Sequence, residues 1–211
     1  MRTRIKFCGI TRSDDARRSI ELGVDAIGFV FTRASQRFIG ISQARSIRAE
    51  VAPFVTVVAL FMDDEAGWIE EVISGVQPDL LQFHGAETGG FAASFARPYI
   101  KAVPMGSLAD PSRHIASYPG AAGFLLDSHA HGERGGTGES FDWARVPAGT
   151  ARPFVLAGGL TPHNVAQAVA TVRPYAVDVS SGIESAPGIK DAAKIRDFIR
   201  AVHSADAARG A

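Results

Sequence analysis

Residues 153–182 read PFVLAGGLTPHNVAQAVATVRPYAVDVSSG, in which a strand pattern, a helix pattern and a second strand pattern follow one another. The runs Pro153–Ala157 and Ala176–Val179 predict strands, because both are short, mostly apolar and bounded by turn residues. Between them, apolar residues three and four positions apart predict a helix over Thr161–Val172, with Thr161 as its N-cap and Pro162 at its first position. A strand, a helix and a strand in this order form the repeating unit of parallel sheets.

The same alternation extends toward both ends of the chain. Six more strands are predicted, at Arg4–Cys8, Asp25–Phe31, Phe54–Phe61, Asp79–Phe83, Tyr99–Val103 and Ala122–Leu126. Further helix patterns cover Ser13–Leu22, Ser42–Glu50, Asp64–Ser74, Glu87–Ala96, Pro111–Ser117, a short piece after Phe141, and a C-terminal helix behind Asp191. Eight strands alternating with helices in 211 residues predict an α/β protein with a single-domain (β/α)8 TIM barrel.

An open doubly wound sheet is the alternative fold. Against it, the turn Cys8–Thr11 after the first strand lacks the spaced glycines of a dinucleotide site, and no GxxxxGK[ST] motif is present. We therefore expect residues 1–202 to form the barrel. Residues 203–211, HSADAARGA, are small and polar, and we expect them to form a frayed C-terminal tail.

Composition narrows the class of partner. Lys and Arg total 22 and Asp and Glu total 22, so no net positive charge favours nucleic acid or anionic lipid. The apolar stretch Val51–Met62 is too short to span a bilayer. The first residues, MRTRIKFCGITR, do not resemble a secretory signal, so we expect a cytoplasmic protein with a small-molecule partner, no nucleic acid and no membrane. Monomer and homodimer both stay open.

The active site of such a barrel lies at the carboxyl ends of the strands. Cys8 ends the first predicted strand and Asp127 follows the sixth, three strands away around the ring. A cysteine thiolate can act as a base and a half-buried carboxyl group can act as an acid, so the two form a candidate catalytic pair. The alternatives are a small buried hydrophobe for Cys8 and a helix N-cap for Asp127.

Two further rim residues are candidates for binding substrate. Arg37 can bind a carboxylate through two parallel hydrogen bonds, and its alternative is a solvated loop arginine. His84 either lines the site or remains at the rim. The glycine-rich stretch 129–140 suits a lid, with a surface loop as the alternative. Its His129, His131 and Glu133 do not have the spacing of a metal site, so we expect no metal.

The last two strands end in loops that suit an anion. Gly158 and Gly159 follow the seventh strand, and Ser180, Ser181 and Gly182 follow the eighth. Barrels often bind phosphate at these two loops, because glycines let backbone N–H groups approach the oxygens closely. Ordinary turns are the alternative.

Taken in order, the strand-end motifs resemble those of the phosphoribosylanthranilate isomerase family of tryptophan biosynthesis. The motifs are KFCGIT at 6–11, SQR at 35–37, LQFHG at 81–85, LLD at 125–127, GGTG at 135–138, FDW at 141–143, LAGGL at 156–160 and VDVSSGIE at 177–184. Gln36 departs from the proline of many relatives, which we expect to loosen Arg37. Phe7 stands where a β-branched residue is usual, and strand alternation predicts that it points away from the site.

The resemblance implies an Amadori rearrangement of N-(5'-phosphoribosyl)anthranilate. In it Asp127 is the general acid, Cys8 the general base, and Arg37 meets the anthranilate carboxylate. The loops with Gly158, Gly159 and Ser180–Gly182 hold the phosphate, Asp178 lines the pocket without an assigned role, and neither metal nor organic cofactor is needed.

Two other functions remain as alternatives. The related sugar isomerases of histidine biosynthesis have an aspartate where this chain has Cys8. A non-catalytic barrel that binds a phosphorylated metabolite needs neither an acid nor a base, whereas this chain has candidates for both.

Overall fold

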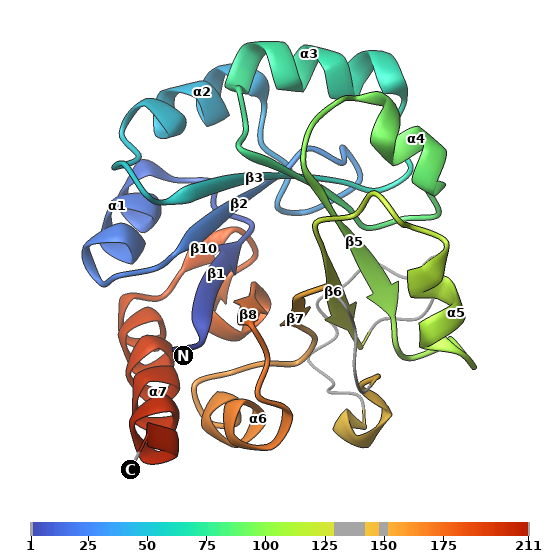
Figure 1. Cartoon of the computed structure of the whole chain (residues 1–211). Coiled ribbons are helices and arrows are strands. Elements are labelled where there is room, and N and C mark those ends of the chain that lie inside the picture. The colour runs from blue at the N-terminus through green and yellow to red at the C-terminus, as the bar shows by residue number, and fades with distance from the viewer. Residues whose placement is uncertain (1, 129–141, 148–151, 211) are drawn as a thin grey trace.

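The computed structural model describes residues 2–128, 142–147 and 152–210. Eight parallel strands form a closed barrel in sequence order, and β1 pairs with β8 to close it (Figure 1). The strands are β1 Arg4–Cys8, β2 Ala26–Val30, β3 Thr56–Phe61, β4 Leu80–Phe83, β5 Tyr99–Pro104, β6 Gly123–Asp127, β7 Phe154–Leu156 and β8 Ala176–Val179. The predicted TIM barrel is confirmed, and the open sheet is wrong.

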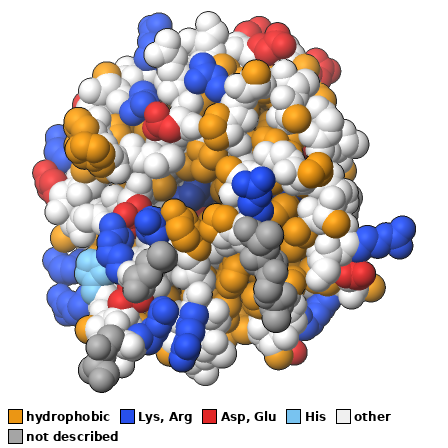
Figure 2. All heavy atoms as spheres, viewed as in Figure 1, with side chains coloured by type: hydrophobic (Ala, Val, Ile, Leu, Met, Phe, Trp, Pro, Cys, Tyr) orange, Lys and Arg blue, Asp and Glu red, His pale blue; other side chains and the backbone are white. Residues whose placement is uncertain are grey.

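Helices surround the barrel in Figure 1. They are α1 Ser13–Glu21, α2 Ile41–Ala49, α3 Ala66–Val76, α4 Gly89–Ser94, α5 Pro111–Ala116, the short 3-10 helix η1 Trp143–Arg145, α6 Val165–Val172 and α7 Ala192–Gly210. Among the described residues, no helix is long and apolar enough to cross a membrane. Figure 2 shows charged side chains of both signs spread over one face, in keeping with the equal numbers of acidic and basic residues.

Strand alternation divides the side chains into two layers. The larger apolar core lies between the barrel and the helices, where Phe7 of β1 packs edge-on against Phe198 of α7 with ring centroids 5.9 Å apart. A smaller apolar cluster inside the barrel contains Ile100, Ala102 and Leu125. Phe7 therefore faces the helices, as predicted, while its neighbours on β1 face the barrel interior.

Most predicted helix boundaries lie within about two residues of those in the structure, but the start of α6 and the end of α7 differ by more. Helix α6 begins at Val165, because residues 161–164 form a turn in which the Asn164 side chain accepts from the Thr161 amide at 2.8 Å. The Thr161 hydroxyl still accepts from the His163 backbone N–H at 3.3 Å, the contact expected of an N-cap, but at the start of this turn. Helix α7 continues to Gly210, so the expected frayed tail at 203–211 is helical through residue 210. Two contacts explain this: Ala205 is buried, and the Asp206 carboxylate accepts from the Thr3 backbone N–H and hydroxyl.

A short hairpin between β8 and α7 was not predicted. The 3-10 helix η2 Ser181–Ile183 leads into β9 Glu184–Ala186, which pairs antiparallel with β10 Ile189–Lys190. Asp191 then caps α7, accepting from the backbone N–H groups of Ala193 and Lys194 at 2.8 and 3.0 Å. The hairpin carries Glu184 and Lys190 back to the barrel mouth.

Candidate active site

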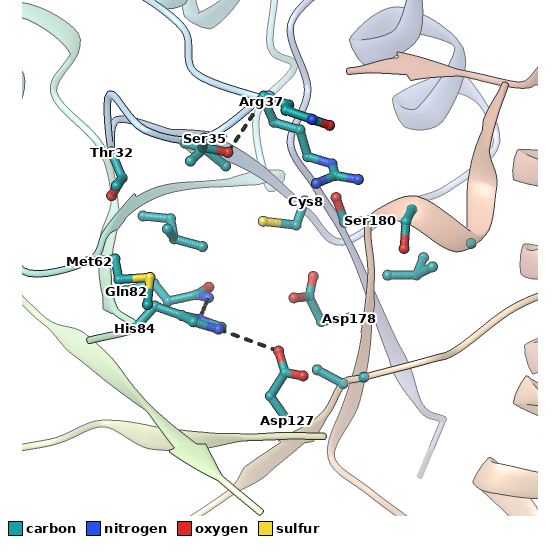
Figure 3. A pocket seen from close by; sticks show the side chains of 18 of the residues that line it. Cys8, Thr32, Ser35, Arg37, Met62, Gln82, His84, Asp127, Asp178 and Ser180 are labelled. Atoms are coloured by element: carbon teal, nitrogen blue, oxygen red, sulfur yellow. Dashed lines mark hydrogen bonds and ion pairs between the residues drawn. The ribbon is translucent and has the colours of Figure 1, made fainter. Parts of the chain in front are cut away.

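A cavity of about 560 Å³ opens at the carboxyl ends of the strands. All ten site residues predicted from the sequence line it: Cys8, Arg37, His84, Asp127, Gly158, Gly159, Asp178, Ser180, Ser181 and Gly182. Figure 3 shows Cys8 and Asp127 pointing into the same space from opposite walls, with Asp178 between them. Residues up to 174 positions apart (182 − 8) therefore meet in one cavity, as expected for side chains at the carboxyl ends of barrel strands.

Cys8 is a buried thiol surrounded by charge. Burial raises its pKa, because the thiolate loses hydration, and the Asp178 carboxylate acts in the same direction. The ammonium groups of Lys6 and Lys190 oppose this, since each stabilises the thiolate. Lys190 also anchors the end of β1, donating from Nζ to the Cys8 carbonyl at 2.6 Å. The thiol form is favoured, and the nearby cations decide how readily the proton leaves.

Asp127 belongs to a row of three polar side chains. The imidazole Nε2 of His84 lies 3.4 Å from Asp127 Oδ2, and Gln82 Nε2 lies 3.1 Å from His84 Nδ1 (Figure 3). With the Gln82 amide donating to Nδ1, neutral His84 carries its proton on Nε2 and donates to Asp127. With the amide reversed, its oxygen accepts from Nδ1–H, and Nε2 accepts a hydrogen bond from the protonated carboxyl group of Asp127. His84 thus contacts the candidate acid and does not remain at the rim.

Arg37 is fixed by an internal carboxylate. Its Nε and Nη2 donate to the two oxygens of Glu184 at 2.9 and 2.7 Å, and its backbone N–H donates to Ser35 Oγ at 3.1 Å. This pairing raises the pKa of Arg37. Arg37 therefore has a fixed carboxylate partner in the structure, with Gln36 before it. Since Glu184 occupies the Nε–Nη2 edge, the Nη1–Nη2 edge of the guanidinium is the one that a ligand carboxylate can meet.

The two loops predicted to bind phosphate lie together at the cavity wall. Gly158 has φ +82°, and a Cβ at this residue would lie 2.4 Å from Ser128 Oγ, so only glycine fits. Ser180 Oγ is buried and has no hydrogen-bond partner within residues 2–128, 142–147 and 152–210. A bound anion can supply the acceptor that this hydroxyl lacks.

Three charged residues of the site had no role in the sequence-based prediction: Lys6, Glu184 and Lys190. Lys6 had a usable signal, because a lysine on the inward face of a buried strand needs an anionic partner. Its partner is Asp178, with Nζ to Oδ1 at 2.9 Å. Glu184 and Lys190 gave no such signal, since the Pro187-Gly188 pair between them marks a turn but does not show where that turn folds.

The predicted lid at 129–140, and with it His129, His131 and Glu133, lies outside the described residues. Within the part of the chain that the structure describes, no group of three or more His, Cys, Asp or Glu side chains is arranged to hold a metal ion.

The chain matches known proteins over nearly its full length. The family model for N-(5'-phosphoribosyl)anthranilate isomerase matches residues 5–201. A relative with that name from Halorhodospira halophila is 53% identical over 206 residues, covering 98% of this chain and 99% of its own. The relative from Xanthomonas campestris is 52% identical over 211 residues, covering 97% of this chain and 95% of its own.

Solved structures give the same result. Phosphoribosyl anthranilate isomerase from Thermotoga maritima superposes with TM-score 0.86 at 40% identity, covering 96% of this chain and 99% of its own. A second solved isomerase holds reduced 1-(o-carboxyphenylamino)-1-deoxyribulose 5-phosphate, with TM-score 0.80, 38% identity and the same coverage. A third structure, with TM-score 0.81 and 36% identity over 95% of this chain and 98% of its own, is of monomers made from the dimeric Thermotoga maritima enzyme. By sequence and by fold, this chain belongs to the N-(5'-phosphoribosyl)anthranilate isomerase family.

Proposed function

We propose that the cavity isomerises N-(5'-phosphoribosyl)anthranilate to 1-(2-carboxyphenylamino)-1-deoxyribulose 5-phosphate, with Asp127 as general acid and Cys8 as general base. The observation that carries the assignment is that the Asp127 carboxyl group of β6 and the Cys8 thiol of β1 enter one cavity, which the glycine- and serine-bearing loops after β7 and β8 also line. Membership of the isomerase family supports the reaction, and the geometry supports the division of roles.

The reaction begins with proton transfer from Asp127 to the ribose ring oxygen. The C1–O bond then breaks, and the nitrogen lone pair forms the C1=N bond of a Schiff base. The Cys8 thiolate removes the proton from C2, and those electrons form the C1=C2 bond of an enolamine while the nitrogen recovers its lone pair. Tautomerisation of the enolamine, with loss of the C2 hydroxyl proton and protonation of C1, gives the ketone.

Binding groups surround these two residues. The free edge of Arg37 suits the anthranilate carboxylate, and the loops holding Gly158, Gly159 and Ser180–Gly182 suit the phosphate. His84 orients Asp127 through the contact at 3.4 Å. Each of these roles is part of the proposal.

The test is turnover of freshly generated substrate, followed by loss of its fluorescence. Native protein should convert it, while Asp127→Asn and Cys8→Ala should each lower kcat by a factor of about 10²–10⁴, the usual contribution of a general acid or base. Binding of a reduced product analogue should be retained by both variants, which shows that the site is intact. Unchanged kcat in either variant would remove that residue from the mechanism.

We also propose that the protein forms a homodimer, as is stated for the Thermotoga maritima relative. Phe54 precedes β3 at the end of the barrel remote from the cavity, is fully exposed and has φ +73°. An exposed aromatic residue in a left-handed conformation costs about 1–3 kcal/mol unless a contact stabilises it. A second copy of the chain can provide that contact.

Sedimentation over a range of concentrations tests the assembly. The native chain should sediment as a dimer, Phe54→Glu as a monomer, and Leu22→Glu, at another exposed apolar residue, as the native chain does. A native chain that stays monomeric at every concentration would contradict the proposal.

A further inference from the structure

Lys6 is a buried cation inside the barrel, directly below the mouth of the cavity. Its side chain is 6% exposed, and its Nζ donates to Asp178 Oδ1 at 2.9 Å. A buried ion pair is costly, because both partners lose hydration, and apolar residues could fill the same space. The reaction proposed above gives neither residue a task.

Gly28 of β2 lies beside both the Lys6 ammonium group and the Cys8 thiol. A Cβ built on Gly28 would lie 3.1 Å from Cys8 Sγ and 3.2 Å from Lys6 Nζ. The missing side chain of Gly28 therefore leaves one small space that the thiol and the ammonium group share. Any larger residue would push Lys6 or Cys8 away.

Charged groups face Cys8 from four elements. Lys6 comes from β1, Asp178 from β8, Lys190 from β10 and Arg37 from the segment after β2. Arg37 and Lys190 are already paired with Glu184, at 2.7 and 2.8 Å. Lys6 is the cation that shares the space at Gly28 with the sulfur, and Asp178 is the anion that fixes it there.

We propose that Lys6 and Asp178 are positioning residues that act through Cys8, with the Lys6 ammonium stabilising the thiolate and Asp178 holding Lys6 in place and limiting that stabilisation. This proposal rests on the function proposed above only for its catalytic consequence. The electrostatic effect on the thiol exists whether or not Cys8 is the base.

The two residues should shift the ionisation of Cys8 in opposite directions. In Lys6→Met the thiolate loses the cation that shares the space at Gly28 with it, so the pKa of Cys8 should rise by about one unit. In Asp178→Asn the competing anion is gone, so the pKa of Cys8 should fall by up to about one unit. A role in packing alone predicts no such opposite pair of shifts.

Cys8 is the only cysteine, so alkylation by iodoacetamide reports on it alone. The rate of alkylation, followed by mass spectrometry across a pH series, gives the midpoint for thiolate formation. The double variant Lys101→Met/Glu87→Gln is the matched control, because it removes another buried lysine–carboxylate pair, 3.1 Å apart, outside the cavity. Its midpoint should equal that of the native chain.

The outcomes are separate from those for turnover. An unchanged midpoint in Lys6→Met, or shifts of Lys6→Met and Asp178→Asn in the same direction, would overturn the proposal. If Lys6→Met does not fold, Asp178→Asn and the double variant Lys6→Met/Asp178→Asn decide, with the double variant expected between the two single ones. Opposite shifts in a chain that does not convert the substrate would support this inference and reject the proposed function.

In an active chain, the acidic limb of the pH profile of kcat/KM should follow the same midpoints. It should move to higher pH in Lys6→Met and to lower pH in Asp178→Asn, since the base must be a thiolate. A limb that stays fixed while the alkylation midpoints move would show that Cys8 is not the base.

Discussion

Glu184 links two cations at the cavity wall, since its carboxylate accepts from both Arg37 and Lys190. Replacing Glu184 with Gln leaves the Arg37 guanidinium without a charged partner. The guanidinium is then no longer held in a single orientation. We expect KM to rise about tenfold, the effect of losing one charge-assisted hydrogen bond, with little change in kcat. Steady-state kinetics measure both, and Ser185→Ala, the exposed neighbour on β9, is the control.

The same variant should reveal a pH dependence of stability. Burial alone would raise the pKa of Glu184, but Arg37 and Lys190 outweigh it and lower the pKa below its ordinary value of 4.5. The folded state thus gains stability above about pH 4.5 and loses it as pH falls through the lowered pKa. The free energy of unfolding of the native chain should exceed that of Glu184→Gln by about 3 kcal/mol at pH 7. Urea titrations should show the gap closing in acid, and a constant gap would contradict the ion pairing.

Single residues divide into those that the sequence could place and those that it could not. Cys8 and Asp127 were placed correctly, because a residue at the carboxyl end of a barrel strand must face the mouth or the helices, and strand alternation decides which. The pairing of Lys6 with Asp178 depends on the closure of β1 against β8, which brings together positions 172 apart. No local pattern encodes such a contact.

At the scale of elements, the turn after β7 depends on one glycine. In Gly158→Ala, a residue at φ +82° would direct its Cβ into Ser128, so the turn must move. We expect a loss of about 1–3 kcal/mol in the free energy of unfolding and weaker binding of inorganic phosphate. Gly67→Ala, in α3 with open space around its Cα, should be neutral or slightly stabilising. Equal effects of the two changes would contradict the assignment.

The last part of α7 should contribute to stability as well. Deleting residues 203–211 removes the buried Ala205 and the Asp206 carboxylate that binds the start of β1. Asp206→Ala alone should cost about 1.5–3 kcal/mol, the range for hydrogen bonds to a charged group. Asp197→Ala, which breaks an exposed pair at 3.9 Å with Arg200, should cost less than about 1 kcal/mol. A truncated chain as stable as the native one would contradict this prediction and would favour the interpretation of residues 203–211 as a frayed tail.

Two helix boundaries were predicted wrongly, one where two local patterns compete and one where a tertiary contact extends the helix. Thr161 and Pro162 suit a helix start, yet α6 begins only at Val165, because the Asn164 side chain accepts from the Thr161 amide and closes a turn before the helix. Residues 203–210 have weak apolar periodicity, yet the contact with Thr3 holds them helical. The first correction comes from a local hydrogen bond inside the predicted segment, and the second from a contact between two elements that are far apart in the sequence.

At the scale of the whole molecule, a further buried ion pair joins Lys101 of β5 to Glu87. Lys101 of β5 donates to Glu87 at 3.1 Å and to the backbone carbonyls of Phe83 and Gly85, so it fastens β5 to the segment that follows β4. Lys101→Met alone should cost about 3–5 kcal/mol, because it leaves the Glu87 carboxylate buried without its cation. The double change Lys101→Met/Glu87→Gln should cost less than the two single changes together. Additive losses would show that the two side chains act independently.

Fold class was the most predictable level. Strands that alternate with helices at similar spacing form a parallel sheet covered by those helices. Eight such strands favour closure of the sheet into a barrel. The hairpin β9–β10 was missed, because its two short strands bury little and follow a serine-rich turn typical of many loops. This hairpin carries Glu184 and Lys190, so the charge balance at Cys8 was the least predictable part of the site.

The contact between Thr3 and Asp206 also brings the start of β1 beside the last turns of α7, at the end of the barrel remote from the cavity (Figure 1). A solid support, a fluorescent label or a second enzyme joined to either terminus would thus leave the mouth open to solvent. The molecule can be tethered by its base and still exchange substrate with the surrounding solution.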